Sequence, residues 1–313
     1  MLEQADQRKT LSKEEYKTKA PGLKEQMGIL QQTIKKSRLP VIVLFEGWGA
    51  AGKGSMISHL ILTLDPRGFK VYSMATANEA ERRKPLMWRY WDTIPEEGNL
   101  SIYDRSWYQE LFISAVEEDL PREEVEQRIH NINTFERQLT DNGYLIVKFF
   151  LHISQSEQKE RLDALAASKA TAWRVSEHDL KRNRQYNRYY KFIDQMLART
   201  NPGYAPWHIV PSHDRHTAQA HILETLISSI TLCISGNMPK PPASPALTAV
   251  QEDGPYAPRR FQLLAMPRLK DIPLNQTVTD EEYDEQLHKA QKKLSKLHSR
   301  LYREKIPVVM AFE

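Results

Sequence analysis

The sequence predicts an α/β fold in which a parallel sheet is sandwiched between helices. Short apolar runs of strand length alternate with longer helix-compatible segments between Pro40 and Leu232. Such alternation is typical of parallel sheets, because each parallel strand is reached through a crossover that usually contains a helix. In addition, a glycine-rich loop, residues 47–55, joins the first apolar run to a segment of helical character.

Each element follows from hydrophobic spacing and from the Pro and Gly residues that interrupt it. A lead-in helix ends near Arg38, because Met27, Leu30 and Ile34 share one helical face and Pro40 follows. The expected strands are residues 41–45, 69–74, 100–103, 144–151 and 207–210. One expected helix carries Met56 to Ile61. The other expected helices cover residues 81–91, 122–139, 157–191 with a break at 170–176, and 218–232.

Composition favours a cytoplasmic protein. Apolar residues make up 40% of the 313 residues, no apolar run approaches the ~20 residues of a membrane span, and the polar N-terminus has no signal-like apolar core. The single cysteine, Cys233, excludes a disulfide within the chain. The net charge of +4 is small, but basic residues cluster at 82–89 and 181–191. These clusters suit a polyanionic ligand, and they equally suit solvated helix faces.

The glycine-rich loop carries the pattern G-x-x-x-x-G-K, which binds phosphate when it follows a strand and opens a helix. Backbone N–H groups then face phosphate oxygens, while the helix N-terminus and the lysine add positive charge. A turn without a ligand is the alternative. Gly54 stands where NTPases usually carry the Ser or Thr that holds magnesium, so only Ser55 offers a hydroxyl. The candidate phosphate-binding residues here are Gly47, Gly49, Gly52, Lys53, Gly54 and Ser55.

A second candidate site follows the strand at 100–103. Asp104 stands at the carboxyl end of that strand, where parallel sheets gather ligands and where phosphate-loop proteins keep a magnesium-binding carboxylate. Arg105 beside it could bind a phosphate with two N–H groups. A surface ion pair is the alternative for this Asp-Arg pair.

The first part of the sequence is repeated near the end of the chain. Residues 11–46 align without a gap on residues 278–313 at a constant offset of 267, as from Tyr16 to Tyr283. The aligned segments share the helical apolar stripe and also the Pro and Phe-Glu that follow it. We expect a domain at 1–235, a Pro-rich linker at 236–275 and the truncated start of a second, repeated domain at 276–313.

Together these motifs resemble the polyphosphate kinase 2 family, phosphotransferases that use inorganic polyphosphate as phosphoryl donor to a nucleotide. The likeness covers residues 11–234 and rests on FEGWGAAGKGS, on YDRSWY, on residues 77–91, on KFFLHISQSEQKERL and on AWRVSEHDL. It implies a P-loop kinase-like sheet with a helical lid at about 155–195. The tandem duplication is similar to that of the polyphosphate:AMP phosphotransferase branch, which makes ADP from AMP.

The resemblance also implies roles for single residues. Lys53 would hold phosphates, Asp104 would ligate Mg²⁺ and Arg105 would stabilise the transferring charge, which makes these three the candidate catalytic residues. Further phosphate contacts would come from Arg82, Arg83 and, near the lid tip, Arg174. The implied partners are inorganic polyphosphate and AMP or ADP, with no nucleic acid and no membrane. Pairing with its own second domain and a homo-oligomer are further expectations.

Gly49 departs from the family pattern, which usually reads Gly-x-Asp-Ala-Ala-Gly-Lys-Gly at this loop. Glycine cannot replace a carboxylate that acts at the metal, and in two-domain members the first copy is commonly regarded as degenerate. Three hypotheses stay open. This copy binds polyphosphate or nucleotide and takes part in transfer, it is a scaffold or regulator of the second domain, or the protein is an ATP-using nucleoside monophosphate kinase.

Overall fold

The computed structural model describes residues 1–4, 10–74, 76–239, 277–304 and 306–311. It contains two compact units, Met1–Val250 and Gln251–Glu313. Most of the expected linker, residues 240–275, lies outside the described residues.

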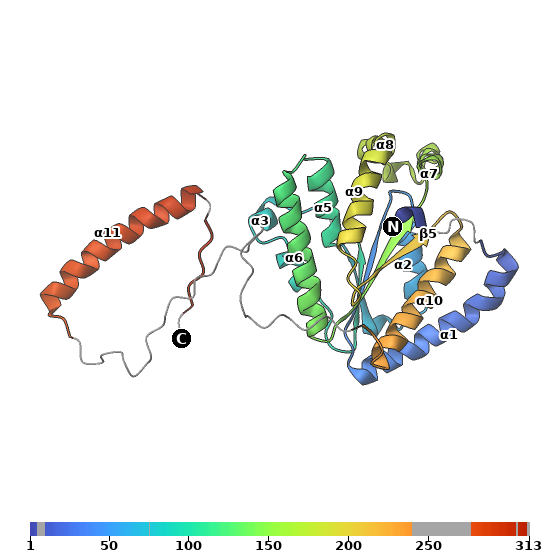
Figure 1. Ribbon diagram of the computed structural model, residues 1–313, viewed down its shortest axis with the longest axis horizontal. Helices are drawn as coiled ribbons and strands as arrows, with labels where there is room; N and C mark the ends of the chain where they lie inside the picture. Colours follow the sequence, from blue (N-terminus) through green and yellow to red (C-terminus); the bar gives the residue numbers. More distant parts are fainter. Residues whose placement is uncertain (5–9, 75, 240–276, 305, 312–313) are drawn as a thin grey trace. The chain divides into compact units, whose positions relative to one another are not determined.

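One parallel sheet organises the first unit, with strands in the order β2-β3-β1-β4-β5 (Figure 1). The strands are β1 (Val41–Gly47), β2 (Phe69–Ser73), β3 (Leu100–Asp104), β4 (Leu145–His152) and β5 (Trp207–Pro211). The central strand β1 pairs with β3 and β4, so that Val41 lies opposite Leu100 and Leu145. Because all five strands are parallel, their carboxyl ends meet at one edge. The predicted α/β fold and its five strands are confirmed.

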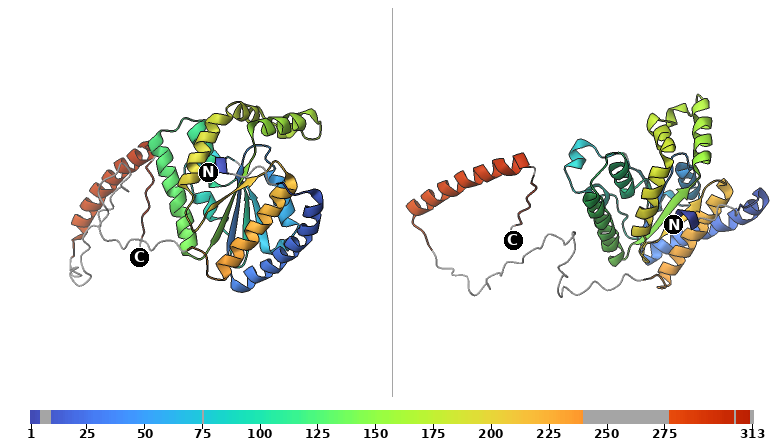
Figure 2. Two further views of the ribbon diagram at one scale, coloured as in Figure 1. Left: turned by 45° about the vertical axis from the view of Figure 1, so that its right-hand side comes forward. Right: turned by 45° about the horizontal axis from the view of Figure 1, so that its top comes forward.

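Helices cover both faces of this sheet (Figures 1 and 2). On one face lie α1 (Lys13–Ser37), α2 (Lys53–Ile61) and α10 (Arg215–Ile234). On the other lie α5 (Trp107–Val116), α6 (Arg122–Asp141) and α9 (Tyr186–Arg199). Near the carboxyl ends of the strands lie α7 (Gln155–Ala167), the short η3 (Ala172–Arg174) and α8 (Glu177–Arg184), together called the lid below. The remaining short helices of this unit are η1 (Leu2–Gln4), η2 (Pro66–Gly68), α3 (Glu79–Arg82) and α4 (Trp88–Trp91).

One helical prediction was wrong, and one helix was not predicted. The expected continuous helix at 81–91 is split into α3 and α4, because Pro85 lies between them and disfavours helical backbone at the residue before it. Helix α5 was not predicted, since its sequence WYQELFISAV is mostly apolar and gives little amphipathic signal.

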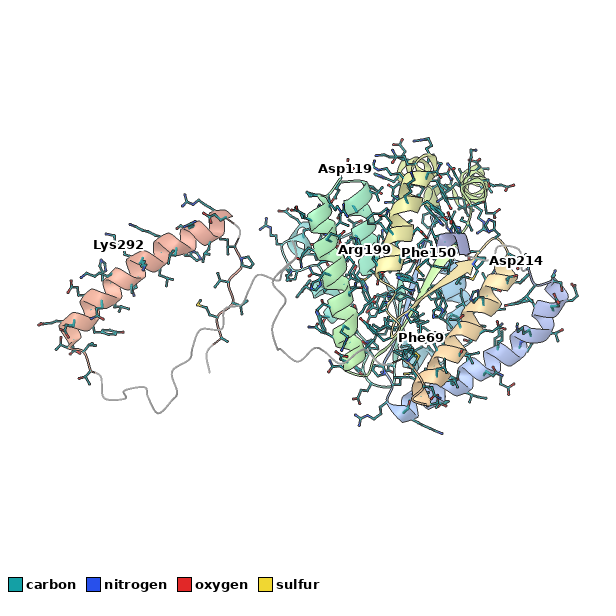
Figure 3. All side chains as sticks on the ribbon, in the orientation of Figure 1. Phe69, Asp119, Phe150, Arg199, Asp214 and Lys292 are labelled. Carbon is teal, nitrogen blue, oxygen red and sulfur yellow. The ribbon has the colours of Figure 1, made fainter. Side chains whose placement is uncertain are left out.

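Helix α10 is the one helix among the described residues that is long and apolar enough to cross a membrane by length and composition. It packs against α1, β4 and β5, and its buried apolar side chains, among them Ile222, Leu223 and Leu226, belong to the core of the first unit. Asp214 is the N-cap of this helix (Figure 3). Phe150 of the neighbouring strand β4 is buried in the interior (Figure 3).

A buried ion pair crosses the core between the sheet and α6. Lys148, in the middle of β4, donates from Nζ to Glu136 Oε2 at 2.7 Å, to the Thr200 carbonyl at 2.7 Å and to the Tyr108 hydroxyl at 3.2 Å. Glu136 Oε1 accepts from the Tyr108 hydroxyl at 2.6 Å and from Trp107 Nε1 at 3.1 Å. Both charges are fully buried and fully hydrogen-bonded, which is the condition under which a buried pair is tolerated.

The second unit contains α11 (Asp280–Glu304), which repeats α1 position for position. Both ends of α11 lie 267 residues after the ends of α1, at Lys13 and Ser37. The capping box of Ser12 and Glu15 returns as reciprocal bonds between Thr279 and Glu282. The bond from Leu39 N to Ile34 O likewise returns from Ile306 N to Leu301 O. The repeat seen in the sequence is therefore also a repeat of local structure.

Replacing Lys148 by Met should leave Glu136 as an unpaired buried charge. We expect the free energy of unfolding, measured by urea denaturation, to fall by about 3–5 kcal/mol. The double variant Lys148→Met with Glu136→Leu removes both charges and should be more stable than the single variant. Lys70→Met, at an exposed position on the edge strand β2, is the matched control. A loss below about 1 kcal/mol in the single variant would contradict this account.

Candidate active site

The glycine-rich loop leaves β1 in contact with the end of β4. Gly47 has a φ of +138°, and a Cβ added to it would lie 2.4 Å from the Leu151 carbonyl oxygen, so no side chain fits there. Trp48 N then donates to that same carbonyl at 3.3 Å. Gly52, with a φ of +94°, is the N-cap of α2 and turns the chain into the helix. These two glycines shape the loop through the conformations that they permit.

Trp48 anchors the loop to the sheet. Its indole Nε1 donates to His152 Nδ1 at 3.0 Å, and its ring stacks on Tyr186 at 4.0 Å between centroids. Burial lowers the pKa of His152 to about 4, which keeps Nδ1 free to accept this bond at neutral pH. The second residue of the loop is thus a buried structural anchor that cannot contact a ligand in the open groove.

Lys53 begins α2 and reaches back over the loop. Its Nζ donates to the Gly47 carbonyl at 2.9 Å and to the Trp48 carbonyl at 3.0 Å. Burial lowers the pKa of Lys53, and the nearby Arg105 lowers it further, while Asp104 and Glu46 act in the opposite direction. A bound phosphate would offer this ammonium group a charged acceptor in place of two neutral ones.

Asp104 and Arg105 lie beside this loop because β3 is the neighbour of β1. Arg105 adopts a left-handed backbone with a φ of +68°, and its N–H donates to the Phe45 carbonyl at 3.1 Å. Such a conformation is costly for a residue other than glycine, and it occurs often at functional sites. Within the described residues neither side chain has a hydrogen bond or an ion pair, so both are available to a ligand.

Glu46, which the sequence analysis did not select, lies beneath the loop. Its Oε1 accepts from Ser106 N at 2.6 Å and from the Ser106 hydroxyl at 2.8 Å. Burial raises the pKa of Glu46 to about 7, although the bonds from Ser106 and the charges of Lys53 and Arg105 work against that rise. Two signals could have revealed it. A charged residue ends an otherwise apolar strand, and the same residue returns in the repeat as Glu313.

An open groove of about 980 Å³ runs over the loop and under the lid. Five cationic side chains line it, namely Lys53, Arg105, Arg161, Arg174 and Arg215. Asp104 is the only carboxylate among its described lining residues. Arg161 is already engaged, since it donates to the carbonyls of Ala50, Ser212 and His213. The groove suits an extended polyanion.

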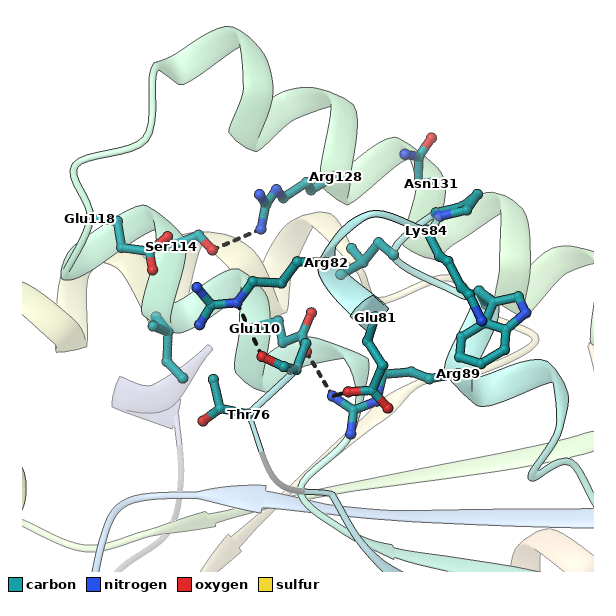
Figure 4. A pocket seen from close by; sticks show the side chains of 15 residues that line it. Thr76, Glu81, Arg82, Lys84, Arg89, Glu110, Ser114, Glu118, Arg128 and Asn131 are labelled. Carbon is teal, nitrogen blue, oxygen red and sulfur yellow. Dashed lines mark hydrogen bonds and ion pairs between the residues drawn. The ribbon is translucent and has the colours of Figure 1, made fainter. Parts of the chain in front are cut away.

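A side pocket of about 360 Å³ lies between α3, α4, α5 and α6 (Figure 4). Arg89 forms ion pairs there with Glu110 at 3.0 Å and with Glu81 at 3.8 Å. Lys84 Nζ lies 3.2 Å from the centre of the Trp88 ring, and Arg128 donates to the Ser114 hydroxyl at 2.7 Å. Its remaining polar lining side chains are Thr76, Arg82, Glu118 and Asn131. The pocket thus offers a large ring, cations, carboxylates and neutral hydrogen-bonding groups to one ligand.

A smaller loop cavity of about 80 Å³ shares lining residues with both of these spaces. It shares Lys53 and Arg105 with the groove and Ile113 with the side pocket. Its lining also includes Gly47 and Gly49 of the loop. Lys53 and Arg105 therefore face both the groove and the loop cavity.

The structure brings most of the selected residues together. Gly52, Lys53, Gly54, Ser55, Asp104, Arg105 and Arg174 line the groove, and Gly47 and Gly49 line the loop cavity. Arg82 lies apart from them in the side pocket. Arg83 is 77% exposed, pairs with Glu79 and lines none of these three spaces. Two of the five basic residues at 181–191 form ion pairs, Arg182 with Glu117 and Arg188 with Asp119.

The oxygen atoms that the groove offers fit a magnesium ion that is held mainly by the phosphates of a bound substrate. In the described part of the chain no three His, Cys, Asp or Glu side chains gather as a metal cage. Asp104 instead offers one unpaired carboxylate, and Ser55 offers a hydroxyl on the same groove. Mg²⁺ often binds through one or two carboxylates together with substrate phosphates and water.

Comparison with known proteins finds relatives of this chain. A family model described as Polyphosphate kinase 2 matches residues 10–234. A polyphosphate:AMP phosphotransferase of Pseudomonas aeruginosa is 29% identical over 301 residues, covering 95% of this chain and 58% of that protein. The chain spans about half the length of this relative and of two others with the same name.

Solved structures show the same likeness. The crystal structure of Polyphosphate Kinase 2 from Arthrobacter aurescens TC1 superposes with a TM-score of 0.71 and 26% identity, covering 78% of this chain and 88% of that one. A putative polyphosphate kinase 2 from Pseudomonas aeruginosa PA01 gives a TM-score of 0.71 and 29% identity, covering 75% of this chain and 50% of that one. Since the family model matches well over half of its residues, the chain belongs to the polyphosphate kinase 2 family.

Proposed function

We propose that the protein containing this chain transfers a phosphoryl group from inorganic polyphosphate to AMP, giving ADP. One observation carries the proposal. Lys53 and Arg105 line both the open cationic groove and the loop cavity, and that cavity shares Ile113 with the side pocket, so a phosphate chain and a second ligand would meet near these two cations. The relatives named polyphosphate:AMP phosphotransferase support the choice of substrates.

The groove is the proposed donor site. Its cations are spread along the loop, the lid and the start of α10, which matches a linear polyanion better than a single phosphate. Arg174 and Arg215 have no ion-pair partner among the described residues, so a bound chain would not have to displace a protein carboxylate from them. Trp173 is 76% exposed beside Arg174 at the lid tip, where it adds no enclosed site for a base.

The side pocket is the proposed acceptor site. It has a smaller volume than the groove, and Trp88, one face of which is covered by Lys84 Nζ, gives it an aromatic surface for a nucleobase. Arg82 and Arg128 are candidates for the acceptor phosphate, since both line the pocket without an ion-pair partner among the described residues. Arg89 is instead held by two carboxylates and would keep α4 in place against α5.

Catalysis in this arrangement is positioning and charge stabilisation. Lys53 would hold the donor phosphates against the loop, and Arg105 would stabilise charge on the transferring group. When bound, Mg²⁺ would neutralise phosphate charge, and Asp104 and Ser55 would be the residues that hold it. Glu46 acts indirectly, because its bonds to Ser106 fix the residue that follows Arg105.

The tail at 276–313 is the proposed start of a second domain of the same fold. In α1 the residues Tyr16, Ala20 and Met27 are buried against the core. Their counterparts 267 positions later, Tyr283, Leu287 and Leu294, are exposed along α11. The relative from Pseudomonas aeruginosa aligns over 95% of this chain, so the likeness continues beyond the first unit. We infer that this apolar stripe packs on a second sheet as α1 packs on the first.

Replacing Lys53 by Ala should lower ADP formation from AMP and polyphosphate by at least ~10²-fold, because one aimed cation is lost at the transferring phosphate. Lys70→Ala on the exposed edge of β2 is the control and should leave the rate unchanged. ATP should not replace polyphosphate as the donor. Turnover with ATP and none with polyphosphate would rule out the proposed donor, and Lys53-dependent polyphosphate binding without turnover would favour a scaffold or regulatory role.

Two adjacent arginines test the acceptor pocket. Arg82→Ala should raise the KM for AMP about tenfold, because Arg82 lines the side pocket, and should leave the KM for polyphosphate unchanged. Arg83→Ala should change neither value, because Arg83 pairs with Glu79 on the surface. Equal effects of the two variants in steady-state kinetics would place AMP elsewhere.

Shortening the chain after residue 239 tests the domain division. If α11 belongs to a second domain, its removal takes no packed side chain from the first unit. We expect the free energy of unfolding of the first unit to change by less than about 0.5 kcal/mol. A loss of several kcal/mol in urea denaturation would show that the tail belongs to the first domain.

A further inference from the structure

The lid brings a carboxylate to the glycine-rich loop at Gly49. A Cβ added to Gly49 would lie 3.3 Å from Asp179 Oδ1 and 3.5 Å from Gln158 Nε2. Asp179 is the third residue of α8 and lies 130 positions after Gly49 in the chain. It also lines the loop cavity together with Lys53 and Arg105.

Buried polar contacts hold this part of the lid on the loop. Gln158 of α7 is 1% exposed and donates from Nε2 to the Gly49 carbonyl at 3.2 Å. Its Oε1 accepts from Asn183 Nδ2 at 3.0 Å, and Asn183 also donates to the Gln155 carbonyl at 3.0 Å. Because these buried groups satisfy one another, α7, α8 and the loop are fixed together at Gly49.

Only one oxygen of Asp179 is used for local structure. Oδ2 accepts from Ser176 N at 3.0 Å and from the Ser176 hydroxyl at 2.6 Å, which completes the capping box of α8. No donor reaches Oδ1 within the described residues. The negative charge nevertheless acts on Lys53, whose pKa it raises against the larger effects of burial and Arg105. A half-buried carboxylate oxygen therefore faces the loop with an open coordination position.

We propose that Asp179 supplies to the glycine-rich loop the carboxylate that Gly49 cannot provide, and that it does so toward Mg²⁺ bound to a phosphate chain. This inference rests on the proposed function, since it takes a phosphate chain as the ligand of the loop.

The negative charge of Asp179 determines which form of the phosphate chain it would attract. A bare phosphate chain in the loop cavity would be repelled by Oδ1, whereas a chain carrying Mg²⁺ would be attracted to it. Asp179 would thus act in opposite directions on the two forms of the same ligand. A residue that only caps α8 would affect both forms alike.

The test measures the Kd of the full chain for inorganic polyphosphate by isothermal titration calorimetry, once with Mg²⁺ and once with EDTA. Asp179→Asn keeps one oxygen for Ser176 and removes the charge. We expect about tenfold weaker binding with Mg²⁺, and equal or tighter binding with EDTA. Glu177→Gln, an exposed residue of the same helix, should change neither Kd, and Ser176→Ala tests loss of the cap alone.

A second variant checks that the two positions are equivalent. Gly49→Asp alone would place two carboxylates together and should weaken Mg²⁺-dependent binding. Gly49→Asp combined with Asp179→Asn should return the Kd to within about threefold of the wild type, because one carboxylate is again present.

The outcomes separate this inference from the proposed function. A wild-type chain that does not bind polyphosphate would refute the proposed donor, and this inference with it. If the wild type binds but Asp179→Asn weakens binding equally with Mg²⁺ and EDTA, or changes neither, the assignment of Asp179 fails and the donor site stands. If the double variant folds but its Kd does not return toward the wild-type value, Asp179 does not stand in for a carboxylate at position 49.

Discussion

The close approach of Gly47 to Leu151 is the constraint on which the site depends. No side chain fits between them, so β1 continues to the very end of β4 before the chain turns. Trp48 then donates to the Leu151 carbonyl and to His152, which fixes the loop on β4. Lys53 can reach back to the Gly47 carbonyl only because the loop returns over this point. The position of the main cation thus follows from a steric limit inside the sheet.

Two groups of charges in this unit differ in whether they have partners. Lys148 and Glu136 are buried, paired and saturated with hydrogen bonds, so they hold the sheet to α6 and have no capacity for a ligand. At the carboxyl edge, Asp104 and Arg105 are left without a partner among the described residues. Opposite charges kept close but unpaired suit a ligand that carries both phosphate and a cation, because each protein charge then gains its partner on binding.

Local sequence patterns predicted the strands and the loop, because strand length, apolar runs and glycine spacing are properties of neighbouring residues. They also predicted that Asp104 would lie at the edge of the sheet where ligands gather, since it ends a parallel strand, but they did not predict that β3 is the neighbour of β1. They did not predict Glu46 bound to Ser106, or Gln158 bound to Gly49, because these partners lie 60 and 109 residues apart. Pro85 is a local signal within residues 81–91, and it separates α3 from α4 where one helix was predicted.

If a metal-binding carboxylate is on the lid and not on the loop, the metal site is complete only when the lid lies against the loop. An aspartate at position 49 would be present whatever the lid does, whereas Asp179 faces the loop only while α8 lies against it. Gln158 and Asn183 hold that contact, so they would couple lid position to metal affinity. By linkage, Mg²⁺ bound with a phosphate chain would in turn stabilise the closed lid by the same free energy. The substitution at Gly49 would then convert a fixed metal ligand into one that depends on closure.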